Sequence, residues 1–346
     1  MLDNADYIIY KWEEVRPGVW VDEWYWWVGT ALAALFAVFT GFNDAGALVG
    51  VALRVRGLRP LAAVVLLGLA VLVAPVLLGA AVAATLDHRL VVFDTGPLAN
   101  AAGPRLPLLV GIAAAVLVTV VIAGRGLPTS LTLALVGGIA GAGVGARRPV
   151  DWTIVAGVLA AAAAAPVVGA LVALGVCRLL AVVPFAVRRL RWLHTAAYTA
   201  TCVAYGANDG QKMLAVYAAV HGGTPHRYVA SLPVLALIGG CFVLGALLGL
   251  PRLAPGVGGQ LAPARADAVV ATEVSGACVV LGTAAVGAPV SMTQSLSGAL
   301  VGTGLSRGGR RVRWRGVLRL GLAWLVTLPA AFAAAVVSCA ALSAAR

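Results

Sequence analysis

Apolar stretches of about twenty residues follow one another along almost the whole chain. Residues 61–84 and 106–123, for example, contain no charged side chain. A helix of this length spans the hydrocarbon core of a bilayer, which is about 30 Å thick. The strands of a membrane β-barrel would instead alternate apolar and polar residues over short segments. The pattern therefore predicts an all-α, polytopic helical protein with roughly 10–12 membrane segments, multi-pass in the cell membrane and surrounded by lipid.

Prolines and glycines leave the limits of some segments open. Residues 61–84 read as one span with a kink at Pro75. The stretch 127–145 is short, rich in glycine and opens with hydroxyl residues, which indicates a re-entrant hairpin or a broken helix. Residues 152–187 contain two prolines, so they predict either one long kinked span or two separate elements.

The formal net charge of +12 comes mainly from arginines that lie between the apolar stretches. They form short clusters within residues 54–59, 188–191 and 307–315. The positive-inside rule accounts for such clusters, and with ten crossings all three fall on one side, predicted to be cytoplasmic. We therefore expect no nucleic-acid partner. The five cysteines are scattered singly, without the spacing of metal ligands.

The chain contains two sets of matching landmarks. They recur in the same order at nearly the same separation: Gly41-Phe42-Asn43-Asp44 with Gly206-Ala207-Asn208-Asp209, Pro128-Thr129-Ser130-Leu131-Thr132 with Pro289-Val290-Ser291-Met292-Thr293, and Trp152 with Trp314. Together they predict an internal duplication. We expect a polar N-terminal segment, 1–23, a first membrane repeat, 24–191, and a second, 192–346. An odd number of crossings in each half would invert the two repeats, with broken helices or re-entrant hairpins meeting near the midplane.

Ionisable residues inside apolar stretches are the first candidates for function, because each costs roughly 2.5–3.5 kcal/mol on insertion scales. The carboxylates of Asp44 and Asp209 predict a cation site. It would bind either a sodium ion, together with Asn and backbone carbonyl oxygens, or a proton. Structural alternatives stay open. The aspartates could cap helices, Lys212 could extend to the membrane interface, and Glu273 could be a buried acid that pairs with another helix.

Hydroxyl residues open two of the glycine-rich stretches. Thr129, Ser130 and Thr132 stand in the first, and Ser291 and Thr293 in the second. Hydroxyls and exposed N–H groups at helix N-termini favour an anion without the Coulomb attraction of an arginine, which allows release. The pattern predicts an oxyanion site, although Ser and Thr in membrane helices also form hydrogen bonds between helices.

At these residues the chain resembles the inorganic phosphate transporter (PiT) family. The run 206–212 looks like the family's second-half signature, 41–45 like its first, and 289–293 like its Pro-Val-Ser-x-Thr-His segment, preceded by a glutamate as Glu273 is here. The resemblance covers about 26–343. It implies a symporter of inorganic phosphate rather than an enzyme, driven by sodium or protons and often homodimeric, with no further cofactor.

The resemblance assigns roles by position to the Asn-Asp pairs, the hydroxyl segments and Gln211, and the ionisable Lys212 and Glu273 are added to them as candidates. For phosphate binding we expect Thr129, Ser130, Thr132, Asn208, Gln211, Lys212, Ser291 and Thr293. For cation coupling we expect Asn43, Asp44, Asp209 and Glu273, with Asp44 and Asp209 as possible sodium ligands.

The chain departs from the family pattern in both halves, and more often in the first. Ala47 stands where the family has a second Asn, and Leu133 and Gln294 stand where it has His. The register of the repeats places Ile112 opposite Glu273, so the first half lacks that acid. The coupling ion and the substrate are therefore open.

Three alternative functions stay open. One is a sulfate permease of the same fold, since sulfate is a similar tetrahedral oxyanion. Another is a membrane sensor or scaffold that no longer transports. A third is a membrane enzyme that uses Asp87, His88 and Asp94 as acid, base or metal ligands.

Overall fold

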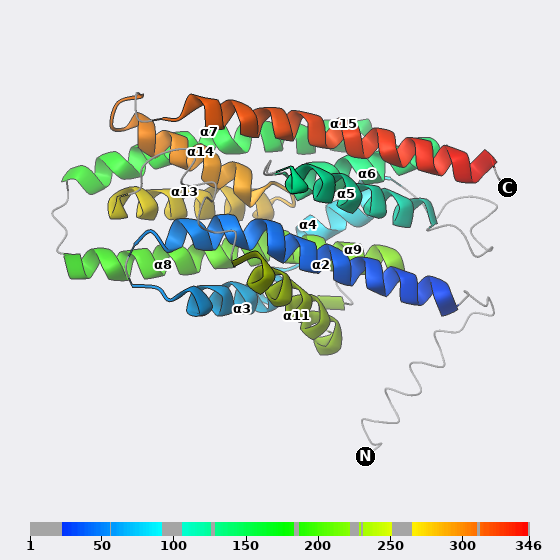
Figure 1. The fold of residues 1–346 in the computed structure, drawn as a ribbon, viewed down its shortest axis with the longest axis horizontal. Helices are drawn as coiled ribbons and strands as arrows, with labels where there is room; N and C mark the ends of the chain where they lie inside the picture. The colour runs from blue at the N-terminus through cyan, green and yellow to red at the C-terminus, as the bar shows by residue number, and fades with distance from the viewer. Residues whose placement is uncertain are drawn as a thin grey trace, which may run out of the picture.

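A computed structural model describes residues 23–55, 57–91, 106–125, 129–182, 187–221, 228–229, 231–250, 265–309 and 312–344. Within these ranges the regular structure is helical, apart from an isolated bridge between Val91 and Val150. Figure 1 shows the helices lying mostly along the long axis of one bundle. The predicted N-terminal segment lies outside the described residues except for Glu23, as does Asp94 of the enzyme alternative.

The helices follow the apolar stretches. They are α2 (Glu23–Ala52), α3 (Pro60–Leu78), α4 (Ala81–Ala84), η1 (Thr85–Arg89), α5 (Leu106–Gly124), α6 (Leu131–Gly145), α7 (Trp152–Val182), α8 (Val187–Tyr205), η2 (Gly206–Gly210), α9 (Gln211–His221), α11 (Leu232–Gly249), α13 (Ala266–Ala285), α14 (Met292–Leu305) and α15 (Trp314–Ala344). In the described part of the chain, seven are long and apolar enough to cross a membrane: α2, α3, α5, α7, α11, α13 and α15. The prediction of an all-α membrane fold is confirmed.

The structure defines where the helices begin and end within residues 61–84 and 152–187. The single span expected over residues 61–84 was wrong, because α3 ends at Leu78 and α4 begins after the break. Gly79 makes this break with a φ of 84°, a conformation that side chains disfavour. The stretch from Trp152 forms one helix of 31 residues, α7, with Pro166 inside it, which decides between the two readings left open.

Two pairs of helices turn back in the middle of the molecule. Helices α5 and α6 are antiparallel, since Gly111 packs against Gly138 and Ala115 against Ala134. Helices α13 and α14 pair in the same way, since Gly276 packs against Leu296 and Val269 lies in one cluster with Leu300. The tips meet, because the Thr132 hydroxyl at the start of α6 donates to the carbonyl of Val290, 3.1 Å away and just before α14. The hairpin expected over 127–145 therefore includes α5 as its first arm.

The two halves of the chain interlock. Helix α6 of the first half packs along α15 of the second, and α14 of the second half packs along α7 of the first. Likewise α2 packs on α11, and η2 packs on α3. Corresponding elements thus exchange partners between the halves, and both hairpin tips lie next to the second Asn-Asp pair. Inversion of the halves stays a prediction.

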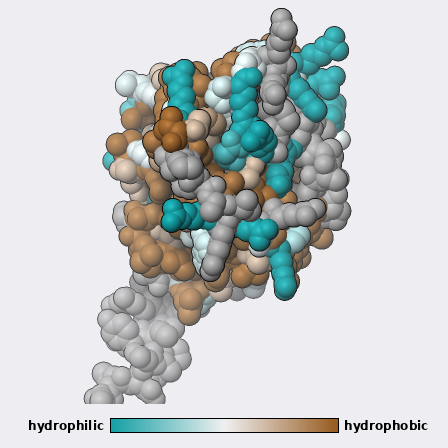
Figure 2. Space-filling model, turned by 90° about the vertical axis from the view of Figure 1, so that its left-hand side faces the viewer, coloured by the Kyte–Doolittle hydropathy of each residue, from teal (hydrophilic) through white to brown (hydrophobic). Residues whose placement is uncertain are grey.

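One end of the bundle is hydrophilic. Helix α2 ends there, and α8 and α15 begin there, on the left in Figure 1. Figure 2 shows many hydrophilic residues spread over this face, with hydrophobic residues between them and on its left side. Arg54 and Arg313 approach one another, and burial together with the charge of Arg313 lowers the pKa of Arg54. This arrangement agrees with the expectation that the arginine clusters share one side of the membrane.

Candidate substrate and cation site

The second Asn-Asp pair lies where the helical run from α8 to α9 widens. Residues Gly206–Gly210 form a single π-helical turn, a feature common at functional sites. Gly206 allows this turn to pack on α3, because a Cβ there would lie 2.2 Å from the carbonyl oxygen of Ala70. Asn208 and Asp209 are 0% and 3% exposed.

Lys212 ties this turn to both hairpin tips. Its Nζ donates to Oδ1 of Asp209 at 2.6 Å and to Oγ1 of Thr132 at 2.7 Å. A third donation goes to the carbonyl oxygen of Val290. The side chain is 2% exposed, so the alternative in which it extends to the membrane interface is wrong. A buried ammonium is tolerated here because a carboxylate and two further oxygens surround it.

Asn208 fixes the tip between α13 and α14. Its Nδ2 donates to Oδ2 of Asp209 at 3.0 Å and to the carbonyl of Val290 at 2.6 Å. Its Oδ1 accepts from the amide of Val290 at 3.3 Å. Both backbone groups of Val290 are thereby satisfied inside the protein, where an unpaired one would be costly.

The first Asn-Asp pair lies in the interior of α2 and makes fewer hydrogen bonds than the second pair. Oδ1 of Asp44 accepts from Nδ2 of Asn43 at 2.8 Å, and Oδ2 accepts from the hydroxyl of Tyr205 at 3.1 Å. Asp44 also lies close enough to Asp209 for their charges to interact. The structure thus brings the two predicted aspartates into one electrostatic site. Tyr205 was not predicted, although it directly precedes the second signature run.

The hydroxyl segments open α6 and α14 differently. Ser130 caps α6, accepting from the amide of Leu133 at 3.3 Å. Ser291 holds the same position before α14, but its Oγ pairs with Oγ1 of Thr293 at 2.8 Å and does not cap the helix. The first N–H groups of α14 are therefore not blocked by this side chain. Oγ1 of Thr129 is buried without a hydrogen-bond partner among the described residues.

Two predicted site residues have other partners. Oε1 of Gln211 accepts from the amides of Val82 and Ala83, at 2.8 and 3.3 Å, and so caps the start of α4. Oε2 of Glu273 pairs with Nδ1 of His194 at 2.9 Å, between α13 and α8. Glu273 lies about three turns before the hairpin tip, so it belongs to a separate buried pair. This is the structural alternative considered above, and His194 was missed.

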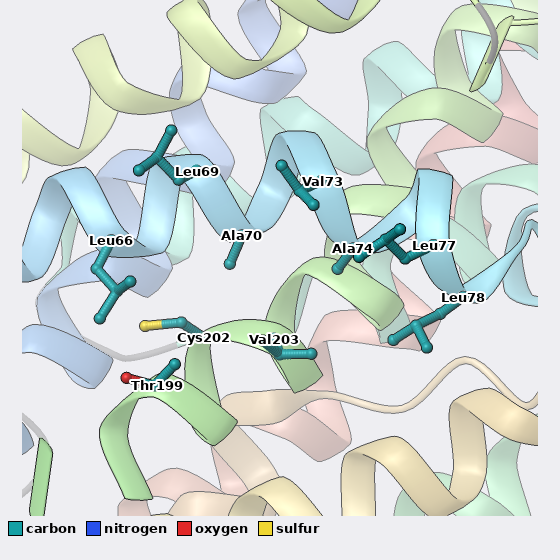
Figure 3. Close-up of a pocket in the computed structure, with 10 residues that line it drawn as sticks. All are labelled: Leu66, Leu69, Ala70, Val73, Ala74, Leu77, Leu78, Thr199, Cys202 and Val203. Atoms are coloured by element: carbon teal, nitrogen blue, oxygen red, sulfur yellow. The ribbon is translucent and has the colours of Figure 1, made fainter. Parts of the chain in front are cut away.

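A groove on the outside of the bundle is a poor substrate site. It lies between α3 and α8, has a volume of about 270 Å³, and is walled mainly by Leu, Val and Ala side chains (Figure 3). Thr199 and Cys202 are the polar exceptions among the labelled residues. The groove offers a phosphate few hydrogen-bond donors, whereas hydroxyls and backbone N–H groups gather at the hairpin tips.

Comparison with known proteins decides the family. The profile described as "Phosphate transporter family" matches residues 40–194 and 182–335. The chain belongs to this phosphate transporter family. The resemblance seen in the sequence is thereby confirmed, and the family is one of membrane transporters rather than enzymes.

Relatives of this phosphate transporter family member match most of its length. A probable low-affinity inorganic phosphate transporter of Mycobacterium leprae is 31% identical over 316 residues, covering 87% of this chain and 74% of the relative. Its counterpart in Rhizobium meliloti is 27% identical, covering 87% and 91%. A solved structure described as "The sodium-dependent phosphate transporter" has a TM-score of 0.79 at 20% identity, covering 92% of this chain and 98% of the other. The fold is therefore that of a multi-pass cell-membrane transporter.

Proposed function

We propose that the chain is a secondary active symporter that carries inorganic phosphate across the cell membrane, coupled to sodium or protons. One observation carries the proposal: both hairpin tips converge on the buried cluster of Asn208, Asp209 and Lys212. The family and the names of the relatives support phosphate as the substrate. We also expect a homodimer.

The phosphate ligands in this proposal are mostly neutral donors. Oγ of Ser291, Oγ1 of Thr293 and the first N–H groups of α14 lie together at one tip. Thr129 adds a buried hydroxyl without a partner from the other tip. Asp209 neutralises Lys212, so phosphate meets a helix N-terminus and hydroxyls rather than an unpaired cation. Binding of this kind permits release, which transport needs.

Coupling in this proposal follows from charge. Phosphate brings negative charge near Asp44 and Asp209, whose carboxylates are buried. A sodium ion or proton at Asp44 offsets the repulsion, which is strong where water is excluded. Each ligand therefore raises the affinity for the other by the same factor. Asn43 supplies a further amide beside this carboxylate.

The test is uptake of radiolabelled phosphate into proteoliposomes that contain the purified protein. Sodium and pH gradients are imposed separately, with and without excess unlabelled sulfate. We expect either the sodium gradient or the pH gradient to drive phosphate uptake that excess sulfate does not inhibit. The gradient that drives uptake identifies the coupling ion. Competition by sulfate would replace the proposal with sulfate transport. No flux of either anion from folded protein would favour the sensor or scaffold alternative.

A further inference from the structure

The two Asn-Asp segments differ at the position three residues after the aspartate. Aligning Asp44 with Asp209 places Ala47 opposite Lys212. Residues three apart lie on the same face of a helix, so this position adjoins the carboxylate in both halves. Lys212 does contact Asp209, whereas Ala47 is a small buried side chain in the core of α2.

The oxygens around Lys212 resemble a cation site. They are a carboxylate oxygen of Asp209, the hydroxyl oxygen of Thr132 and the carbonyl oxygen of Val290. These are the oxygen types that bind hard metal cations in proteins. The hydroxyl proton of Thr132 is donated to Val290, so its oxygen accepts from Lys212. All three contacts therefore use N–H donors of the lysine, which is the full complement of an ammonium group.

We propose that Lys212 is a built-in cation that occupies the second-half cation position, so that Asp209 binds no coupling ion. The first half then holds the exchangeable cation. Among the described residues, the hydrogen-bond partners of the Asp44 carboxylate are the neutral groups of Asn43 and Tyr205. This inference rests on the proposed symport. It adds that the protein carries one cation fewer per phosphate than a transporter with an ion at each aspartate, because a tethered ammonium cannot leave.

The inference gives a defined consequence for Lys212→Ala. The substitution gives the second half the Asp-x-x-Ala pattern of the first, and leaves a buried carboxylate without its cation. The oxygens of Asp209, Thr132 and Val290 would then surround a space left by the ammonium. We expect a sodium ion to bind there, because it is a hard cation and hard cations prefer oxygen ligands.

The test is equilibrium binding of radioactive sodium to the purified full chain, which needs no flux. We expect Lys212→Ala to bind one sodium ion more than the wild type, and Lys212→Ala/Asp209→Asn to lose that gain. Sodium should also raise the unfolding temperature of the single variant more than that of the double variant. An unchanged sodium count with weakened phosphate binding would overturn the inference and make Lys212 a phosphate ligand.

A second variant keeps the inference open to refutation if Lys212→Ala does not fold. Asp209→Asn alone should bind as much sodium as the wild type, because Asp209 holds none. A lower count would overturn the inference. Failure of the proposed function is separate, since it would appear as absent phosphate flux in the wild type, whatever the sodium counts.

Discussion

The two Asn-Asp pairs share a dipeptide but differ in how firmly the protein holds them. Asn208 and Asp209 lie on a π-helical turn and are joined to both hairpin tips through Lys212 and the backbone of Val290. Asn43 and Asp44 lie within α2, where Asn43 is partly exposed. The second pair thus organises the meeting point of the hairpins, whereas the first is less constrained and better suited to exchange a ligand.

Asp209→Asn should have the largest effect on this comparison. The variant leaves the ammonium of Lys212 buried without its carboxylate, and breaking such a pair costs about 3–5 kcal/mol. Because the same ammonium also holds both hairpin tips, we expect phosphate uptake in proteoliposomes to fall to the background level. Size-exclusion chromatography of the purified variant must show folded protein. Normal uptake by folded Asp209→Asn would remove Asp209 from the mechanism.

Asn208→Ala and Asn43→Ala compare the two amides directly. Asn208 makes hydrogen bonds to Asp209 and to both backbone groups of Val290, so its loss should lower the free energy of unfolding by about 2–3 kcal/mol. Asn43 donates to Asp44, and its loss should cost about 1 kcal/mol. Thermal unfolding in detergent measures both. Equal losses would mean that the halves are held alike.

Tyr205→Phe tests whether Asp44 is the exchangeable cation site. The tyrosine hydroxyl donates to Oδ2 of Asp44 and competes there with a cation. Its removal should lower the cation concentration for half-maximal uptake by about threefold to tenfold, from about 1 kcal/mol of lost hydrogen bond.

Tyr198→Phe is the matched control for this measurement. Its hydroxyl donates to the carbonyl of Ala63 at 3.0 Å, so the cation dependence should stay at the wild-type value. A shift of equal size in both variants would show a general effect on packing and would argue against Asp44 as the cation site.

The sequence predicted the fold class because apolar length and charge placement are local properties of the chain. It also predicted that the Asn-Asp pairs and the hydroxyl segments lie together at the candidate binding site. The break at Gly79 was missed because a continuous apolar run gives no sign of where a helix stops. The two carboxylates converge only in three dimensions, through the exchange of helix partners between the halves.

Three further contacts at and near the site could not be predicted, because the sequence does not show which backbone groups are used or where a side chain points. The carbonyl of Val290 is a backbone group, so the identity of the side chain does not indicate that this carbonyl accepts hydrogen bonds from Asn208 and Lys212. His194 lies far from Glu273 in sequence, and Gln211 lies inside the signature run yet faces the start of α4. Membership of a motif places a residue near the site along the chain, but the direction of its side chain decides what it binds.

The smallest expected effects come from the serines that precede α6 and α14, and they compare the roles of the two hairpin tips. Ser130 caps α6, so Ser130→Ala should lower the free energy of unfolding by about 1 kcal/mol. Ser291 caps nothing and pairs with Thr293, so Ser291→Ala should cost less than about 0.5 kcal/mol in stability while weakening phosphate binding several-fold. Thermal unfolding and titration of phosphate dependence give the two quantities. If Ser291→Ala lost stability and kept its phosphate affinity, the tip of α14 would be a structural turn, and the anion would have to bind among the residues that precede α6.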